Sequence, residues 1–296
     1  MMNLKQLYYF VTIAELGSFT RASELLHIAQ PALSMSVRKL EQQLELTLFH
    51  RHDKRISLTD EGKRLLLHGR KILQASDDAL TEMRELKGLE KGEVRVGIPG
   101  MLGSYYFPPL LMAFRERYPN LRLEVIEGGV WELQQLLEKG DIDLAVVAEA
   151  FLRPQLQAEV FLREQMMVTL ATDHPLAQQS SISYQQFFQQ QLVLFKPGYF
   201  HRKLVDQLAS DGGYQPQIGF ETNLIALIKA IVQRGYGIST LLEMVIQPQD
   251  GLVARPFSQP VRLNLALAWR RDGYLSKANR AFADFVLEHA SHNKPS

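Results

Sequence analysis

Hydrogen-bonding and cationic side chains recur on one side of a short segment near the start of the chain. Gln30, Ser34 and Arg38 are four residues apart within QPALSMSVRKLEQQL, the spacing that places residues on one face of a helix, and Met35 lies beside them. Amide, hydroxyl and guanidinium groups hydrogen-bond base edges and phosphates, and a thioether offers an apolar contact, for example to a thymine methyl. The segment therefore has the chemistry of a helix that lies in a DNA groove.

Two helices joined by a tight turn must hold this face outward. Ser18 is predicted to cap the first helix, and Pro31 suits the first turn of the second, where a missing N–H costs nothing. Ala29 offers no capping oxygen, so Gln30 is expected to cap the second helix instead. Apolar residues at three- and four-residue steps predict the buried face of the second helix, namely Ala32, Leu33, Val37, Leu40 and Leu44. The pattern predicts a helix-turn-helix; the alternative is an ordinary amphipathic pair with a solvated outer face.

A helix over residues 4–16 and a small β-hairpin wing over about 50–58 complete the predicted N-terminal domain. The polar turn of the wing is basic, so it suits phosphates or a minor groove. His50 and His52 have no further ligands at metal-binding spacing, and we predict no metal site. The predicted DNA contacts are Ser18, Thr20, Arg21, Gln30, Pro31, Ser34, Met35, Arg38, Arg51, Lys54 and Arg55.

A long amphipathic helix is predicted to follow, with Thr59 as its cap. Apolar residues repeat every seven positions along about thirty residues, which would span roughly 45 Å. Because a heptad seam is most readily buried against a second copy of itself, we expect a homodimer; the alternative is packing on the chain's own C-terminal domain. The predicted dimer contacts are Leu66, Ile72, Leu73, Leu80 and Leu86.

Strand and helix patterns alternate from Val94 onward, including a helix over 105–118 and strands near 168–171 and 263–269. Such alternation is typical of a mostly parallel sheet with helices on both faces. The predicted domains are a winged helix-turn-helix over 1–59, a linker or dimerisation helix and hinge over 60–92, and an α/β effector-binding domain over 93–296, with subdomain I at about 93–163 and 267–296 and subdomain II at about 164–266.

Loops after the strands of the second part are predicted to bind a small molecule, because ligands of open parallel sheets bind beyond the carboxyl ends of strands. Ser104, Lys196 and Arg202 would hold the anionic head group of an organic acid. Aromatic residues and Met101 would pack its apolar body, although Trp131 has an alternative role in the core. The predicted effector contacts are Gly100, Met101, Ser104, Gly129, Val130, Trp131, Lys196, Tyr199, Phe200, Arg202, Thr222 and Asn223.

Composition excludes several classes of protein. The chain of 296 residues is 46% hydrophobic and 22% charged, as expected for a globular protein, and it has no apolar run near the length of a membrane span. The absence of cysteine excludes thiol redox chemistry and cysteine-ligated metals. We find no nucleophile elbow, P-loop or HExxH pair, so we predict neither an enzyme nor a cofactor. With no secretory signal visible, the expected location is the cytoplasm.

Motifs in the first 62 residues resemble those of LysR-type transcriptional regulators. The motifs are Leu4-Lys5-Gln6-Leu7-Tyr8-Tyr9-Phe10, Gly17-Ser18-Phe19-Thr20-Arg21-Ala22, Gln30-Pro31-Ala32-Leu33-Ser34, Leu40-Glu41, Leu48-Phe49 with Arg51, and Leu58-Thr59-Asp60-Glu61-Gly62. The resemblance implies a second part similar to the clamshell of periplasmic solute-binding proteins. It also implies operator DNA, a second copy in a homodimer or homotetramer, a small organic effector and RNA polymerase as partners. The alternative is a solute-binding clamshell without a DNA-binding role.

Overall fold

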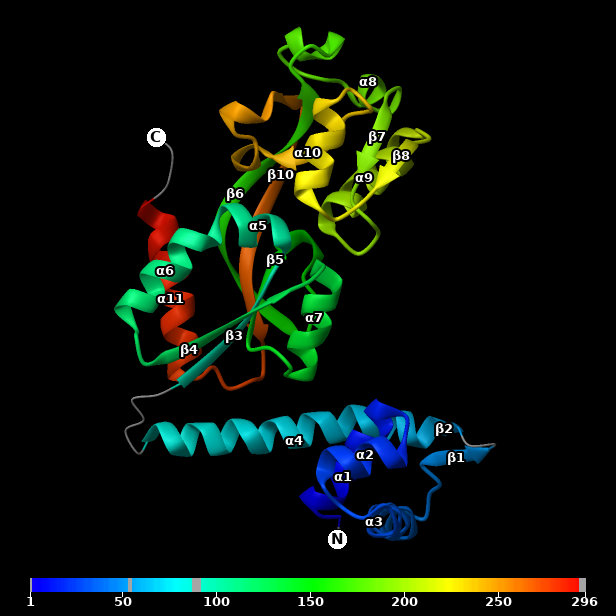
Figure 1. Cartoon of the computed structure of the whole chain (residues 1–296). Coiled ribbons are helices and arrows are strands. Elements are labelled where there is room, and N and C mark those ends of the chain that lie inside the picture. Colours follow the sequence, from blue (N-terminus) through cyan, green and yellow to red (C-terminus); the bar gives the residue numbers. More distant parts are fainter. Residues whose placement is uncertain (1, 53–54, 87–91, 293–296) are drawn as a thin grey trace. The chain divides into compact units, whose positions relative to one another are not determined.

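The computed structural model describes residues 2–52, 55–86 and 92–292 (Figure 1). Two compact units are present, unit 1 over Met1–Gly88 and unit 2 over Leu89–Ser296. The division between them falls within the predicted linker helix and hinge over 60–92, of which residues 87–91 lie outside the described residues. None of the described helices combines the length and apolar character needed to cross a membrane.

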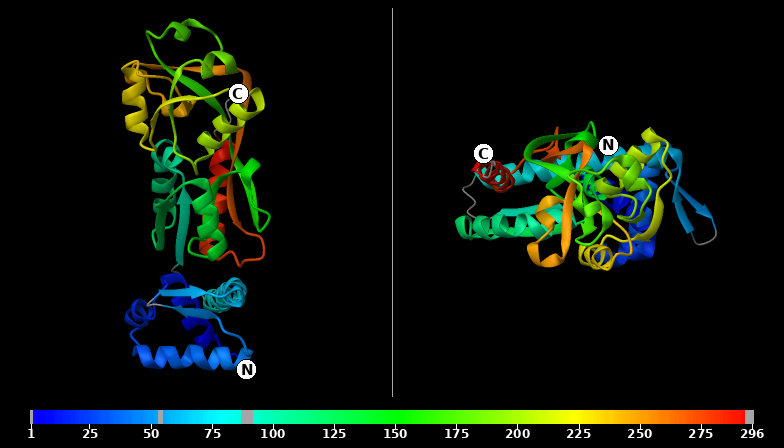
Figure 2. Two further views of the ribbon diagram at one scale, coloured as in Figure 1. Left: turned by 90° about the vertical axis from the view of Figure 1, so that its right-hand side faces the viewer. Right: turned by 90° about the horizontal axis from the view of Figure 1, so that it is seen from above.

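Unit 1 is the predicted winged helix-turn-helix followed by a long helix. Its elements are α1 (Leu4–Leu16), α2 (Phe19–Leu26), α3 (Gln30–Leu44), β1 (Phe49–His52), β2 (Arg55–Leu58) and α4 (Asp60–Leu86). Local chemistry marks two of the helix starts, since Asn3 forms a capping box with Gln6 and Ser18 caps α2. The strands β1 and β2 pair antiparallel, and the hairpin projects beyond the helices of the unit (Figure 2).

The core of unit 1 is built from one face of each helix. Leu7, Phe10 and Ile13 of α1 are fully buried, as are Leu33, Val37 and Leu40 of α3. Their three- and four-residue spacing is the amphipathic pattern that the sequence predicts. Because these apolar side chains point inward, the opposite face of α3 is left to solvent.

Unit 2 alternates strands and helices as predicted. In chain order the elements are β3 (Gly92–Ile98), α5 (Gly100–Tyr105), α6 (Phe107–Arg117), β4 (Leu121–Glu127), α7 (Val130–Lys139), β5 (Leu144–Ala148), η1 (Glu149–Phe151), β6 (Leu156–Ala171), η2 (Pro175–Gln178), α8 (Tyr184–Phe188), β7 (Gln191–Leu194), α9 (Phe200–Gly212), β8 (Gln217–Glu221), α10 (Ile225–Gln233), β9 (Ser239–Leu242), η3 (Glu243–Val245), η4 (Pro248–Asp250), β10 (Leu252–Arg270) and α11 (Lys277–His292).

The larger sheet of unit 2 is mixed, which corrects the expectation of a mostly parallel sheet. Its six strands lie in the order β4-β3-β5-β10-β6-β9, and β7 and β8 form a separate parallel pair. Within the six, β3 is parallel to β4 and β5, whereas β10 is antiparallel to β5 and β6, and β6 is antiparallel to β9. Alternation of strands and helices along the chain does not determine whether neighbouring strands are parallel or antiparallel where the chain crosses between the two halves of unit 2.

Two strands are much longer than predicted. Strands β6 and β10 run side by side over most of their length (Figure 1), and the subdomain boundaries expected from the sequence fall inside them. The sequence pattern revealed only their apolar ends, because exposed or half-buried polar side chains interrupt the remainder, as Gln157, Glu159 and Arg163 do in β6.

The helix predicted over 105–118 is α6, which starts at Phe107, and a separate short helix, α5, ends just before it at Tyr105. Pro108 and Pro109 lack the N–H groups that would bond the preceding turn, so a continuous helix cannot form there. The break begins a new helix with proline in its first turn, where proline is tolerated.

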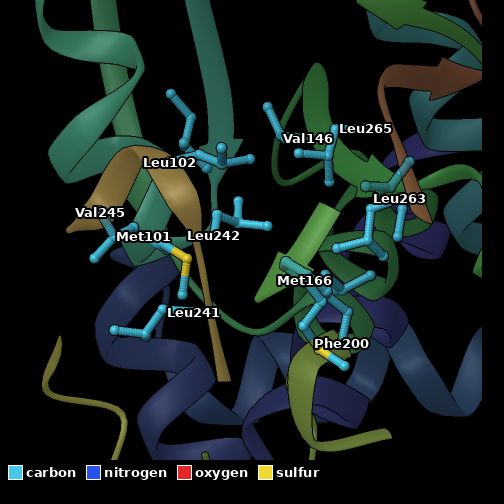
Figure 3. Packing of buried hydrophobic residues seen from close by; sticks show 14 of the residues in the cluster. Met101, Leu102, Val146, Met166, Phe200, Leu241, Leu242, Val245, Leu263 and Leu265 are labelled. Carbon is cyan, nitrogen blue, oxygen red and sulfur yellow. The ribbon is translucent and has the colours of Figure 1, made fainter. Parts of the chain in front are cut away.

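One continuous apolar core fills unit 2. Figure 3 shows its central part, where Met101 and Leu102 of α5 lie near Leu241, Leu242 and Val245 from the β9–η3 segment. These side chains come from both predicted subdomains, so hydrophobic burial joins the two halves.

Candidate nucleic-acid interface and effector site

The helix-turn-helix is held by a short, well-defined turn. The Ser18 hydroxyl accepts the Arg21 N–H at 3.3 Å at the start of α2, and α2 ends at His27, which adopts the left-handed conformation with φ of 51°. A left-handed residue stops a helix and redirects the chain. The chain then enters α3 at Gln30, with Pro31 in the first turn as predicted.

The outer face of α3 carries the predicted recognition residues. Gln30, Pro31, Met35 and Arg38 are exposed, with Met35 at 56%, and Ser34 is half-buried. Arg38 has no ion-pair partner among the side chains that the structure describes. The face therefore offers an amide, a hydroxyl and a free guanidinium to a groove of DNA.

The start of α3 differs from the expectation in one respect. Gln30 is the first helical residue, the N-cap is Ala29, and no side chain caps the helix, so the prediction that Gln30 serves as the cap is wrong. The reason is positional, because a cap side chain must come from the residue before the first helical turn. The exposed side-chain amide of Gln30 therefore forms no capping hydrogen bond at the start of α3.

The other predicted DNA contacts surround α3. Thr20 and Arg21 of α2 are exposed. Arg51 and Arg55 lie on the paired strands of the hairpin, whose register joins Arg51 to Ile56 and His52 to Arg55. Lys54 falls outside the described residues.

Helix α4 uses the first part of its apolar seam inside unit 1. Leu66 and Leu73, two predicted dimer contacts, are half-buried against the unit's own core. At Gly69 the backbone passes so close to α1 that an added Cβ would lie 3.0 Å from a methyl of Val11 and 3.1 Å from one of Leu7. This part of the seam is thus already covered within one copy.

The same seam is uncovered further along α4. Positions 69, 73, 76, 80 and 83 follow one another at three- and four-residue steps, and the last two are Leu80 and Met83, which are 52% and 51% exposed. Ile72 is 39% exposed. Leu86 ends the helix, and its side chain lies outside the described residues. Met83 also belongs to the apolar seam. Counting every seventh residue from Leu66 gives Leu73 and Leu80, so the sequence prediction did not include Met83.

In unit 2, loops from both halves meet as expected. An added Cβ at Gly129 would lie 2.7 Å from the carbonyl oxygen of Gly198 and 3.5 Å from the Tyr199 ring. The Glu127 carboxylate lies over Gly100, so closely that a Cβ there would collide with it. The ends of β3 and β4 and the loop after β7 therefore come together at one place, the loop junction, although the sequence did not single out Glu127.

Several predicted effector contacts serve the core. Met101, Val130 and Phe200 are 4%, 1% and 1% exposed, and Figure 3 shows Phe200 beside Met166. Their apolar side chains are oriented toward the interior, which is why the same residues satisfy both a core and a ligand-site pattern in sequence. Ser104 and Lys196 are exposed at the edge of the junction.

Arg202 is committed to internal partners. Its guanidinium donates to Asp206 at 2.8 Å, to Glu221, and to the carbonyl oxygen of Phe195 at 3.2 Å, and its side chain is 13% exposed. Two carboxylates already neutralise its charge, so the structure gives Arg202 a different role from the predicted grip on an anionic head group.

Polar groups near Tyr199 link the loops. The Asn223 side chain accepts the Lys196 backbone N–H at 3.0 Å, and the Thr222 hydroxyl accepts the Leu224 N–H at 3.2 Å. Burial raises the pKa of the Tyr199 hydroxyl, and the charges of Glu127 and Glu132 raise it further. The junction therefore holds carboxylates as well as the predicted cation Lys196.

Two further residues near the junction were missed from the sequence. The Lys203 ammonium lies 4.2 Å from the ring centroid of Trp131 and 4.7 Å from that of Phe151, so Trp131 packs against Phe151 and a cation. His201 is 1% exposed and lies between the rings of Phe195 and Phe200, and burial lowers its pKa to about 3. No spacing signal reveals the contacts of Lys203, because Trp131 and Phe151 are far from it in the chain.

Together the winged helix-turn-helix, the outward face of α3 and the separate α/β unit define a class of protein, a DNA-binding regulator with its own ligand-binding domain. Comparison with known families agrees. Residues 4–63 match the bacterial regulatory helix-turn-helix protein model of the lysR family, and residues 87–291 match the LysR substrate binding domain. The chain belongs to the LysR family, and it is a LysR-type DNA-binding transcriptional regulator with an effector-binding domain.

Individual relatives extend over nearly the whole chain. The uncharacterized HTH-type transcriptional regulator YwbI of Bacillus subtilis (strain 168) is 30% identical over 292 residues, covering 97% of this chain and 95% of its own. The RuBisCO operon transcriptional regulator of Allochromatium vinosum is 29% identical over 294 residues, covering 98% and 97%. A full-length OxyR variant from Pseudomonas aeruginosa has a similar structure, with a TM-score of 0.74 and 26% identity over 97% of this chain and 95% of that chain. The match to helix-turn-helix regulators rejects the alternative of a solute-binding clamshell without a DNA-binding role.

Proposed function

We propose that two copies of the chain place their α3 helices in successive grooves of one operator, and that a small molecule at the loop junction of unit 2 changes the oligomeric state on DNA. The observation that carries this proposal is the outward face of α3. Leu33, Val37 and Leu40 bury the inner face of α3 in the core, whereas Gln30 is exposed and Ser34 half-buried, and neither side chain has a hydrogen-bond partner among the described residues.

The proposed contacts divide by chemistry. Gln30, Ser34 and Met35 would meet base edges, where an amide can bond adenine and a thioether can contact a thymine methyl. Cations on α2, α3 and the hairpin would neutralise phosphates and so position the domain without reading sequence. Those cations are Arg21, Arg38, Arg51, Lys54 and Arg55.

The second copy would cover the free part of α4. Leu80 and Met83 continue a seam whose earlier members, Leu66 and Leu73, already pack against the core of unit 1, and a helix with an apolar stripe in water is most readily covered by the same stripe of a partner. We therefore propose a homodimer through residues 72–86, with a homotetramer as its further assembly.

RNA polymerase is the proposed partner for activation, and the cytoplasm is the proposed location. The proposal includes no catalytic activity.

The effector is proposed to be a small organic molecule. The loop junction offers backbone groups of residues 99–104 and 128–130 together with Ser104, Lys196 and Tyr199. An acid remains the proposed class, with Lys196 rather than Arg202 as the uncommitted cation. Thermal-shift screening of the full chain against small organic acids, amines and sugars tests this class directly.

The decisive experiment concerns α3. Selection of bound duplexes from random DNA with the full-length protein gives an operator, and gel-shift titration at fixed salt then compares the wild type with Gln30→Ala plus Ser34→Ala. We expect operator affinity to fall by more than tenfold, about one to three kcal/mol for each lost base contact, while non-specific binding changes little.

The control is an exposed position on the same helix that faces away from the proposed contacts. Gln43→Ala should leave operator affinity unchanged, because Gln43 lies on a different face from Gln30 and Ser34. Wild-type affinity in the double variant would refute the assignment of α3 as the base-reading element.

A further inference from the structure

An acidic side chain on α3 is directed toward the base of the hairpin. Glu41 is half-buried, and its Oε1 accepts the backbone N–H of Leu48 at 2.9 Å and lies 3.4 Å from the backbone nitrogen of Phe49. A carboxylate on a DNA-facing helix repels phosphates, so its presence there calls for an internal role. The hydrogen bonds supply one, because they join α3 to the first residues of the hairpin.

Helix α4 holds the same backbone from the other side. The Thr59 N–H donates to the Leu48 carbonyl oxygen at 3.0 Å, and the Thr59 hydroxyl donates to the Thr47 carbonyl oxygen at 2.7 Å. The same hydroxyl accepts the Gly62 N–H at 2.9 Å and so caps α4. At Gly62 an added Cβ would collide with the Leu48 carbonyl oxygen. Residues 47–49, the hairpin base, are therefore held between α3 and α4.

Side chains anchor the hairpin base in the core. Leu48 and Phe49 are 0% and 2% exposed, and the Phe49 ring lies 5.3 Å from that of Phe10 and 5.8 Å from that of Phe19. Beyond this anchor the hairpin is only an antiparallel pair of four-residue strands. Ile56 and Leu58 of the second strand also pack against the core, and the bonds to Glu41 join the base of the hairpin directly to α3.

We propose that Glu41 is a positioning residue for DNA binding, which sets the hairpin at the angle that lets its cations reach phosphates while α3 occupies the groove. The inference rests on the proposed function in one respect, the contact of the hairpin with the DNA backbone. It assigns to Glu41 the reach of its side chain as the property that the hairpin base requires.

A matched pair of substitutions separates reach from charge. Glu41→Asp keeps the charge but is one methylene shorter, so it cannot span to the Leu48 N–H. Glu41→Gln loses the charge but keeps the length and an accepting oxygen. Operator affinity of the full-length variants is measured by gel shift across a range of salt concentrations.

We expect Glu41→Asp to lower operator affinity about five- to tenfold, and to reduce the slope of log affinity against log salt by about one to two, since each lost phosphate contact removes about 0.9 from the slope. Glu41→Gln should stay within about twofold of wild type with an unchanged slope. Partial unfolding of a variant lowers the active fraction but leaves the salt slope intact, so the slope distinguishes positioning from stability.

Other results would overturn the proposal. Wild-type affinity and slope in Glu41→Asp would show that the reach of Glu41 is irrelevant. Tighter binding by Glu41→Gln with an unaltered Glu41→Asp would show that the carboxylate acts only through repulsion of DNA. A wrong assignment of α3 would show as wild-type operator affinity in the Gln30→Ala plus Ser34→Ala variant. That result is independent of the Glu41 variants, so the two hypotheses are tested separately.

Discussion

The two units use their polar residues in opposite ways. In unit 1 the candidate base contacts are on one face of one helix, and the opposite face of that helix makes the core, so base recognition and packing are divided between different residues. In unit 2 the candidate contacts come from loops far apart in sequence, and several also pack the core or neutralise carboxylates, as Phe200 and Arg202 do. A single helix can present a binding surface to a long polymer. A site for a small molecule must enclose its ligand, so the residues that line the site also pack in the core.

Each unit can be monitored separately. Both tryptophans, Trp131 and Trp269, belong to unit 2, so tryptophan fluorescence reports the unfolding of unit 2 alone. Operator binding reports the integrity of unit 1.

Core truncations should separate the units most strongly. Leu33→Ala removes a fully buried side chain from α3 and should cost about 2–5 kcal/mol, enough to abolish operator binding while the tryptophan melt stays at the wild-type temperature. Phe200→Ala should cost about 3–5 kcal/mol in unit 2 and lower that melt. A lower tryptophan melt in Leu33→Ala would show that the two units do not unfold independently.

Replacement of Arg202 tests whether it serves structure or ligand. Arg202→Ala leaves Asp206 and Glu221 without their cation and should destabilise unit 2 by about 1–3 kcal/mol, seen as an earlier tryptophan melt. Lys196→Ala is the matched control, because the exposed Lys196 side chain should contribute less than about 0.5 kcal/mol. Equal melts for the two variants would contradict the structural role of Arg202.

The buried imidazole of His201 makes unit 2 sensitive to acid. Its pKa is about 3 in the folded chain against 6.5 for an ordinary histidine, so between these values the unfolded chain binds a proton that the folded chain does not. Stability from this group is complete above pH 6.5 and falls as the pH decreases, by up to about 1.4 kcal/mol per pH unit.

Urea unfolding followed by tryptophan fluorescence between pH 7 and pH 4.5 checks this dependence. In His201→Leu the free energy of unfolding should depend less steeply on pH, by the contribution of one proton. This change in slope is expected whatever the absolute stability of the variant. His68→Gln, which removes an exposed imidazole of α4, should leave the dependence unchanged. A wild-type slope in His201→Leu would place the acid sensitivity in other groups.

The smallest expected effect is a gain. The N-cap of α3 is Ala29 with extended backbone angles, and no side chain accepts a hydrogen bond there. Ala29→Ser supplies the missing acceptor and should stabilise unit 1 by about 0.5–1 kcal/mol, measured by urea unfolding followed by far-UV circular dichroism. Ala29→Val, which cannot accept a hydrogen bond, is the control and should give no gain.

Some contacts could be predicted because their cause is local. The Ser18 and Thr59 caps and the buried face of α3 follow from residues within one or two turns of each other. The structure confirms both caps and the burial of Leu33, Val37 and Leu40, whereas Leu44 is half-buried and Ala32, expected on the same face, is exposed. The cap expected from Gln30 failed for an equally local reason, since that residue is already inside the helix. The length of β6 and β10 was missed because exposed and half-buried polar residues interrupt their apolar pattern, and because the two strands pair across about a hundred residues of sequence.

By itself the sequence determined the helix-turn-helix, its outward face, the hairpin and the alternation of strands and helices, because each depends on periodicity or capping within a short stretch of chain. Only the tertiary structure decided that the large sheet is mixed, that Arg202 is neutralised by Glu221 and Asp206, and that Glu41 reaches the backbone of Leu48. Those outcomes depend on which distant segments meet, and a side chain's partners are set by that meeting and not by its neighbours in the chain.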